Sequence, residues 1–293
     1  MTLRVLEPGL GTTAQDLGAR GRAHLGESRG GAADMRSLAL ANLAVGNAPD
    51  AMGLEVLLHG PLLQTEVPCV MAWCGAPFDV DVDGAPLPPL APTLLAAGAR
   101  LRVGRTALGL RAALAFAGGV VLPRGTALGA GERVQLAPLV QLGRAPAAAP
   151  RPGVACGALA ALPPLITLRV TESAHSGSFP PAALAALLAE PFVVQPGSNR
   201  RGVRLRGPPL PLPPGPEPVT EGVSLGAIQV TPAGEAIALG VEQTTTGGYP
   251  LLAQLISADT WWLGQLRPGV TVRFERVSLA AARAIFLAEA PWR

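Results

Sequence analysis

Short apolar stretches recur along the whole chain and are separated by glycine and proline. Several alternate strictly between apolar and polar positions, as in residues 78–82, where aspartates separate a phenylalanine and two valines. This period of two places every second side chain on the same face of a strand. We expect strands over residues 3–6, 53–58, 62–66, 70–74, 78–82, 100–103, 110–117, 166–170, 192–195, 202–205, 226–230, 236–240, 252–257 and 271–276.

Three segments have the features of helices instead, namely residues 35–45, 181–189 and 279–289. Asp34 and Ser278 are suitable N-caps for the first and the last of them, because their side chains can accept a hydrogen bond from a free N–H group. The middle one opens with proline, which the first turn of a helix tolerates. Asp83-Gly84 predicts a tight hairpin turn, and the glycine-rich residues 11–31 predict a long loop.

The composition shifts after about residue 137, and residues 143–163 consist mostly of alanine, glycine and proline, which is typical of a linker. We therefore expect a β-rich N-terminal domain at 1–142 and a β-rich C-terminal domain at 164–293. With 36 glycines and 31 prolines, an all-helical fold is excluded. The fold class that we predict is mainly β with a few short helices.

All 23 basic side chains are arginines. Without lysine the chain can hold no Schiff base, no P-loop lysine and no attached biotin. A net charge of +3 is far from the basic surface that nucleic-acid binding needs, so we expect no nucleic-acid partner. An anionic substrate would have to be held by arginine or by backbone N–H groups.

The remaining special residues exclude further classes of protein. Three cysteines (Cys69, Cys74 and Cys156) make no disulfide framework, and we interpret each as a buried thiol. Three histidines (His24, His59 and His175) lack metal-site spacing, so we expect no metal site. We see no secretory signal, and the longest apolar run is shorter than a membrane span, which favours a cytoplasmic protein without membrane contact.

Four polar stretches stand out in this apolar chain. Thr12, Thr13, Gln15 and Asp16 could face a ligand or could bond to their own turn. Residues 195–206 contain four arginines, and Arg200 and Arg204 could converge on an anion or form a solvated basic edge.

The other two stretches lie nearer the C-terminus. Gln229 ends an apolar strand, where a glutamine is usually structural. Residues 242–250 read Glu-Gln-Thr-Thr-Thr-Gly-Gly-Tyr-Pro and hold the only tyrosine of the chain. Their hydroxyl groups and flexible glycines could expose N–H groups to an anion, or could form a tight structural turn.

Taken together and in order, these stretches resemble the biotin-dependent carboxyltransferase family, which is also called the family of the 5-oxoprolinase C subunit, of allophanate hydrolase subunit 2 or of the Kip antagonist. The resemblance covers nearly the whole chain. It rests on residues 8–18 (Pro-Gly-Leu-Gly-Thr-Thr-Ala-Gln-Asp-Leu-Gly), 24–26, 40–47 (Leu-Ala-Asn-Leu-Ala-Val-Gly-Asn), 54–55, 198–205 (Ser-Asn-Arg-Arg-Gly-Val-Arg-Leu), 221–230 (Glu-Gly-Val-Ser-Leu-Gly-Ala-Ile-Gln-Val), 245–250 and 266–269.

The resemblance implies tandem cyclophilin-like β-barrel domains and, as partner, a homologue of the 5-oxoprolinase B subunit. It further implies a complex, which also includes the A subunit, that opens 5-oxoproline to glutamate at the expense of ATP and Mg²⁺. Relatives inside urea carboxylase transfer a carboxyl group from carboxybiotin, and this lysine-free chain would need a separate biotin carrier for that role. We expect the isolated chain to be inactive.

The site residues that we assign on this basis fall into two groups. Catalytic roles go to Asp16, Glu242, Thr245, Thr246 and Tyr249, and substrate-binding roles go to Ser198, Arg200, Arg204, Gln229, Gly247 and Gly248. The two arginines would hold a carboxylate or phosphate, the turn would stabilise developing negative charge, and Asp16 or Glu242 would orient a donor or bind a cation. We expect all of these segments to converge on one cleft, with Glu221 and Glu242 as resting partners of the arginines.

The chain departs from the family pattern at four places within the polar stretches. Gly30 stands where the family usually has serine, Thr244 replaces a glutamine, Leu251 replaces a basic residue, and the loop after Gly119 is shortened. Two alternatives therefore remain beside the 5-oxoprolinase role. One is a non-catalytic protein that sequesters a partner homologous to the B subunit, and the other is a carboxyltransferase component that acts on carboxybiotin.

Overall fold

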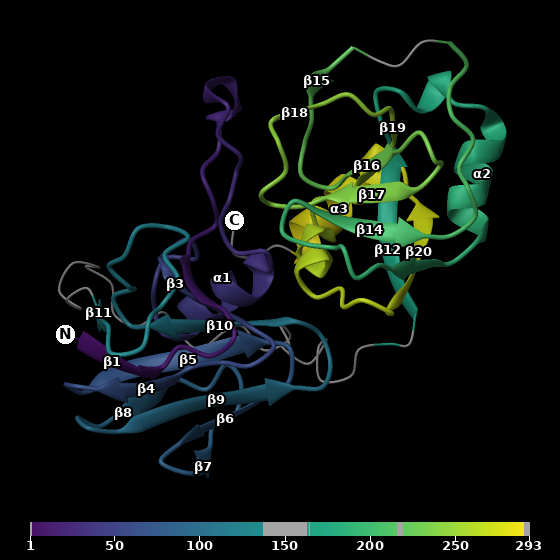
Figure 1. The fold of residues 1–293 in the computed structure, drawn as a ribbon. Coiled ribbons are helices and arrows are strands. Elements are labelled where there is room, and N and C mark those ends of the chain that lie inside the picture. The colour runs from purple at the N-terminus through teal and green to yellow at the C-terminus, as the bar shows by residue number, and fades with distance from the viewer. Residues whose placement is uncertain (1, 137–162, 164, 216–218, 290–293) are drawn as a thin grey trace. The chain divides into compact units, whose positions relative to one another are not determined.

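The computed structural model describes residues 2–136, 163, 165–215 and 219–289. The described residues form two compact units: unit 1 comprises residues 2–18 and 34–136, and unit 2 comprises residues 19–33, 163, 165–215 and 219–289 (Figure 1). The linker expected at 143–163 lies, except for Pro163, outside the described residues.

Unit 1 is built from two sheets that share one hydrophobic core. The six-stranded sheet has the order β11-β1-β4-β9-β6-β7, with β1 Thr2–Glu7, β4 Leu62–Thr65, β6 Phe78–Val82, β7 Ala85–Pro86, β9 Arg100–Thr106 and β11 Arg133–Gln135. The five-stranded sheet has the order β2-β3-β10-β5-β8, with β2 Thr12–Gln15, β3 Gly53–Leu57, β5 Cys69–Gly75, β8 Thr93–Leu95 and β10 Arg111–Phe116. Buried side chains of both sheets, among them Val5, Leu101, Leu54 and Leu114, belong to a single cluster, so the sheets pack face to face.

Helix α1 (Met35–Ala44) covers the second face of the five-stranded sheet. Its buried Leu40 and Ala44 pack with Cys74 of β5 and Ala115 of β10. The predicted cap is confirmed, since the Asp34 carboxylate accepts a hydrogen bond from the Ser37 N–H at 2.9 Å.

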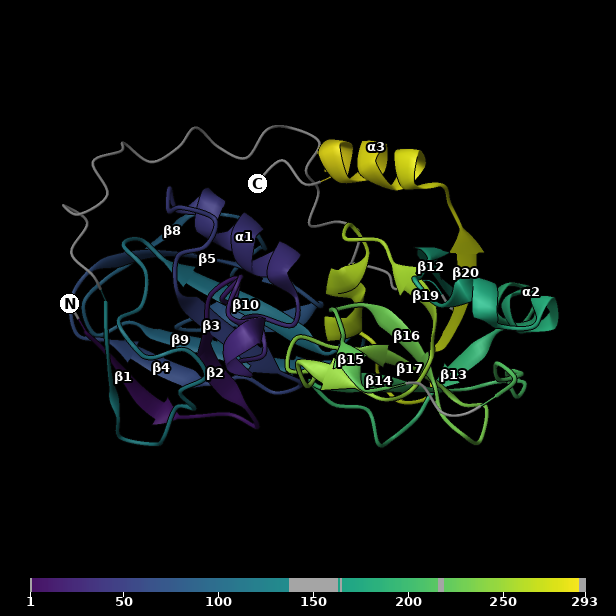
Figure 2. The ribbon, with the colours of Figure 1, turned by 90° about the horizontal axis from the view of Figure 1, so that it is seen from above.

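Unit 2 contains a closed seven-stranded barrel in the order β12-β19-β16-β17-β14-β13-β20. Its strands are β12 Leu165–Glu172, β13 Phe192–Val194, β14 Gly202–Arg206, β16 Ala227–Val230, β17 Ala236–Leu239, β19 Leu251–Leu255 and β20 Thr271–Arg276. Helix α2 (Pro181–Ala189) buries Ala183 and Leu187 and packs against β20, as Figure 2 shows from above. The short strands β15 (Glu221–Gly222) and β18 (Thr246–Gly247) form a separate two-stranded sheet.

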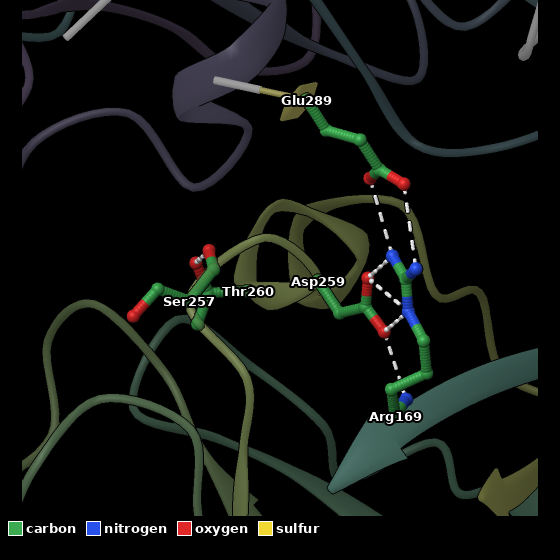
Figure 3. A network of polar contacts seen from close by, with 5 residues as sticks. All are labelled: Arg169, Ser257, Asp259, Thr260 and Glu289. Atoms are coloured by element: carbon green, nitrogen blue, oxygen red, sulfur yellow. Dashed lines mark hydrogen bonds and ion pairs between the residues drawn. The ribbon is translucent and has the colours of Figure 1, made fainter. Parts of the chain in front are cut away.

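The last helix, α3 (Leu279–Glu289), is connected to the barrel by a network of charged groups (Figure 3). The Arg169 guanidinium of β12 lies between Asp259, at 2.5 Å, and Glu289 of α3, at 3.2 Å. Asp259 is buried and also accepts the Arg169 backbone N–H at 2.7 Å. The hydrogen bond to Asp259 is the main reason why the pKa of Arg169 is raised, so Arg169 stays charged and its role in this network is structural.

The mainly β fold class is confirmed, and the three expected helices occur at the predicted places. The hairpin at Asp83-Gly84 is confirmed too, with φ of 51° and 84° at its two central residues. The expected loop at 11–31 is wrong at Thr12–Gln15, which forms β2 and pairs with β3. Because β2 is short and lacks apolar alternation, only its backbone pairing reveals it. Within the described part of the chain, no helix is long and apolar enough to cross a membrane.

Candidate functional site

The Thr245–Tyr249 segment, which we call the glycine turn, lies against the outer surface of the barrel in unit 2. A methyl group added to Gly247 would come within 2.5 Å of the Gln229 side-chain nitrogen. That nitrogen also donates a hydrogen bond of 3.5 Å to the Tyr249 carbonyl oxygen. On the other side, Gly247 pairs with Glu221 across the β15–β18 sheet. The turn is therefore held from two directions, and Gly247 is needed because Gln229 leaves no room for a side chain.

Arg204 and Gln229 belong to the same outer face of the barrel. Both are paired with Ile237 of the strand between them. Directly paired residues in an antiparallel sheet point to the same side, and the neighbours of Arg204 in β14, Val203 and Leu205, are buried in the interior. The exposed Arg204 side chain and the Gln229 side chain thus lie in one row across this face, on strands separated by β17.

The glycine turn presents unused hydrogen-bond donors. Among the described residues, the backbone N–H groups of Gly248 and Tyr249 donate no hydrogen bond, and the hydroxyls of Thr245, Thr246 and Tyr249 make none either. The Tyr249 side chain is 42% exposed. Two consecutive N–H groups without a partner, on a turn fixed from both sides, are an arrangement that can bind an anion or an oxyanion.

Arg200 is used differently from Arg204. Its Nε lies 2.6 Å from Glu242, and its Nη2 donates a hydrogen bond of 2.6 Å to the Gly31 carbonyl oxygen. The Gly30 N–H in turn donates to the Val241 carbonyl oxygen at 2.8 Å. Arg200 therefore fastens the segment around Gly30 and Gly31 to the barrel, and its guanidinium is engaged in these two contacts. The expected pairing with Glu242 is present.

Ser198 supports the start of the Arg204 strand. Its hydroxyl accepts the Arg204 backbone N–H at 3.0 Å. The Arg204 side chain passes over Gly197, where an added methyl group would lie 3.3 Å from its Cδ. Ser198 is thus a neighbour of Arg204 through the backbone, and the structure gives it a positioning contact.

His175 joins this region, although sequence spacing did not single it out. Its Nε2 lies 3.1 Å from Glu221, and its Nδ1 accepts the Leu251 N–H at 3.3 Å. Glu221, expected beside an arginine, therefore pairs with a histidine. His175 and Glu221 are 46 residues apart, and no local pattern announces a contact at such a separation.

Asp16 belongs to unit 1 and is engaged in its own ion pair. Arg124 binds its two carboxylate oxygens at 2.5 and 2.8 Å, and the Gly18 N–H donates to it at 2.7 Å. Partial burial opposes ionisation of Asp16, but the hydrogen bonds from Arg124 and Gly18 outweigh it, so the pKa of Asp16 is lowered. Asp16 thus holds Arg124 and the Gly18 N–H and stabilises its own turn.

A second polar group of unit 1 is buried beside the start of α1; we call Gln15, Asp34, Ser37, Glu55 and Arg111 the buried cluster. Glu55 lies 3.4 Å from the Arg111 Nε and accepts the Asp34 N–H at 3.3 Å. Gln15 is 2% exposed, and its side-chain oxygen has no hydrogen-bond partner among the described residues. Sequence reasoning did not pair Glu55 with Arg111, because the two side chains meet only through strand pairing.

The family departures and the thiols can also be placed. Gly30 adopts a φ of 61°, which disfavours the serine that the family carries there. The Thr244 hydroxyl donates to the Thr246 carbonyl oxygen at 2.7 Å and so closes the turn locally. Cys69 and Cys74 are buried as expected, and burial raises the pKa of Cys69 to about 11, which makes its thiol unreactive. Cys156 lies outside the described residues.

Comparison with known proteins identifies the family to which the chain is similar. The model of the carboxyltransferase domain, subdomains A and B, matches residues 25–276. The chain is 31% identical to the 5-oxoprolinase C subunit of Escherichia coli over 96% of this chain and 93% of that protein. It is 30% identical to the 5-oxoprolinase C subunit of Haemophilus influenzae over 92% of this chain and 89% of that protein.

A solved structure agrees with these sequence relatives. The crystal structure of the Kluyveromyces lactis urea amidolyase superposes with a TM-score of 0.87 and 26% identity. It covers 100% of this chain but only 20% of that much longer protein. The relatives therefore match nearly the whole length of this chain.

Proposed function

The chain belongs to the carboxyltransferase domain family, subdomains A and B, and from this we propose that it is the C subunit of an ATP-dependent 5-oxoprolinase. In this proposal it acts with the A and B subunits to open 5-oxoproline to glutamate. Support comes from the two relatives that are named as C subunits of 5-oxoprolinase, which match over nearly their full length. Those names also support an assembly of several subunits.

The observation that carries the chemical part is the pair of free N–H groups at Gly248 and Tyr249. Opening a lactam ring requires attack on its carbonyl carbon, and the carbonyl oxygen then carries negative charge. Two fixed N–H donors stabilise such an oxyanion without having to reorganise. Gln229 and Glu221 hold the turn in place, so the donors are set before the substrate arrives.

The substrate carboxylate is assigned to Arg204. Its guanidinium is exposed on the same outer face as Gln229, and arginine binds carboxylates through two parallel hydrogen bonds. Arg200 is less suitable, because its guanidinium already holds Glu242 and the Gly31 carbonyl oxygen. Asp16 and Glu242 are both held in ion pairs, and we therefore assign them to positioning.

The nucleotide is assigned to the complex. The chain has no lysine, and none of its glycine-rich segments has the P-loop pattern. Among the described residues, no three His, Cys, Asp or Glu side chains gather in a metal-binding group. ATP and Mg²⁺ would then bind to a partner protein or at an interface with it, and this chain would contribute the oxyanion donors and Arg204.

One observation favours the non-catalytic alternative, in which the chain sequesters a partner homologous to the B subunit. Both carboxylates that could act as a base or cation ligand, Asp16 and Glu242, are neutralised by arginine. A carboxyltransferase role with a separate biotin carrier is the third candidate, supported by the 30% identity to "Urea amidolyase" of Lachancea kluyveri.

Purification of the native complex separates these candidates. The tagged chain should retain homologues of both the A and the B subunits, and the complex should hydrolyse ATP only when 5-oxoproline is present. Recovery of the B subunit without such ATP hydrolysis would favour sequestration. Carboxyl transfer from carboxybiotin without any 5-oxoproline dependence would favour the third candidate and contradict the first.

A further inference from the structure

His175 connects the two ends of the glycine turn. On one side its Nε2 lies 3.1 Å from the Glu221 carboxylate, and the Glu221 backbone pairs with Gly247, the first of the two glycines in the turn. On the other side its Nδ1 accepts the N–H of Leu251, two residues beyond Tyr249. The free N–H groups of Gly248 and Tyr249 lie between these two contacts along the chain.

The segment that carries His175 is itself hydrogen-bonded to β19, the strand that contains Leu251. The Ser176 hydroxyl donates to the Leu252 carbonyl oxygen at 2.7 Å, and the Ser173 hydroxyl donates to the Leu251 carbonyl oxygen. The His175 N–H donates to the Ser173 hydroxyl at 3.3 Å. The backbone that carries the imidazole is therefore held in place. The two ring nitrogens in turn fix the separation between the Glu221 carboxylate and the Leu251 N–H.

The two contacts determine which nitrogen carries the proton. Because Nδ1 accepts the Leu251 N–H, it has no hydrogen of its own, and the proton of the neutral ring must sit on Nε2, where it is donated to Glu221. Asparagine can replace only the Nδ1 contact, and glutamine can replace only the Nε2 contact. Histidine makes both at once.

We propose that His175 is a positioning residue that sets the geometry of the Gly248 and Tyr249 N–H donors by bridging Glu221 and Leu251. The consequence for substrate rests on the proposed function, since it assumes that these donors face the lactam oxygen. The bridge itself does not depend on that assumption and can be tested without any substrate.

The single tyrosine of the chain makes the test selective. Protein labelled only with ¹⁵N-tyrosine gives one amide signal, that of Tyr249 in the turn. We expect His175→Ala to shift this signal, because loss of the contacts to Glu221 and Leu251 changes the surroundings of the Tyr249 N–H. His175→Asn, which keeps the acceptor for Leu251, should recover part of the change. His24→Asn, at an exposed position of the same unit, is the control and should change nothing.

Two further measurements complete the test. The nitrogen shifts of the His175 ring should report the tautomer with hydrogen on Nε2, and Glu221→Ala should disturb the Tyr249 signal more than Glu221→Gln, whose amide oxygen still accepts that proton. An unchanged Tyr249 signal in both His175→Ala and Glu221→Ala would overturn the proposal. Addition of 5-oxoproline to the same samples tests the proposed function separately. If the variants change the Tyr249 signal but 5-oxoproline does not, His175 remains a positioning residue and only the assignment of 5-oxoproline as substrate is refuted.

Discussion

The buried cluster of unit 1 and the glycine turn of unit 2 use similar polar groups in opposite ways. In the buried cluster, the side chains of Glu55 and Arg111 are 6% and 9% exposed, and Glu55 also accepts a backbone N–H. At the glycine turn, the N–H groups of Gly248 and Tyr249 have no partner in the described structure, and Arg204, on the same barrel face as Gln229, is exposed. Satisfied and buried groups contribute to stability, whereas donors that are fixed but unused can still bind a ligand.

This contrast separates two kinds of residue that look alike in the sequence. Arginine next to a carboxylate is structural where the pair is closed, as with Arg200 and Glu242. It is a candidate ligand group where the guanidinium is exposed on the face that also carries Gln229, as with Arg204. Substitutions in the first class should mainly change the free energy of unfolding, and those in the second class should mainly change binding.

The largest effect is expected from Glu55→Ala. Removal of this carboxylate leaves Arg111 in a buried site without that partner, and breaking a buried pair from one side typically costs about 3–5 kcal/mol. Urea unfolding followed by circular dichroism measures the change. Glu172→Ala, which opens the exposed pair with Arg276, is the matched control and should cost less than about 1 kcal/mol. Equal losses in the two variants would show that the buried cluster has no special role in stability.

Gly247→Ala should have the next largest effect, and it should act on binding. The added methyl group displaces the Gln229 amide from the turn, and we expect affinity for 5-oxoproline to fall by about tenfold, or about 1.4 kcal/mol. Gly222→Ala is the control, because a methyl group there meets no atom within 4 Å although Gly222 pairs with Thr246 in the same small sheet. Calorimetric titration of both variants decides, and equal affinities would remove the turn from the site.

Arg204→Ala and Arg200→Ala form a smaller but sharper comparison. Loss of Arg204 should weaken 5-oxoproline binding by several-fold, as expected for one charged hydrogen bond, with the fold unchanged. Loss of Arg200 should instead speed hydrogen exchange of the backbone near Gly30 and Gly31, which it fastens. Hydrogen exchange measured by mass spectrometry and 5-oxoproline binding measured on the same samples distinguish the two arginines. Weaker binding in Arg200→Ala together with faster exchange in Arg204→Ala would contradict these roles.

The smallest effect concerns pH and Asp16. Its pKa is lowered in the folded state, so the ion pair with Arg124 stabilises the fold above the ordinary pKa of 3.8, and this contribution is lost as the pH falls through the folded value. Because solvent still reaches both side chains, the contribution should stay below about 1 kcal/mol. Asp16→Asn should therefore lower the melting temperature more at pH 7 than at pH 2, and a loss of equal size at the two pH values would contradict this explanation.

Local chemistry made much of the fold predictable from the sequence. The alternation of apolar and polar residues predicted both ends of β6 and β20 correctly. Capping residues and prolines indicated the three helices. Strands such as β2, β15 and β18 were missed because they are held by backbone pairing, which leaves little trace in short polar segments. Contacts around the candidate site were predictable where residue type suggests them, as with the pair of Arg200 and Glu242. They were not predictable where partners are distant in sequence, as with Glu221, which pairs with His175 rather than with an arginine.

Activity of the assembled complex tests the central claim most directly. The complex purified with this chain should hydrolyse ATP in a 5-oxoproline-dependent manner, Gly247→Ala should reduce that rate by at least about tenfold, and Gly222→Ala should leave it unchanged. Turnover of 5-oxoproline by the isolated chain, or equal rates for the two glycine variants in the complex, would contradict the claim that this chain contributes a preset oxyanion site to an enzyme of several subunits.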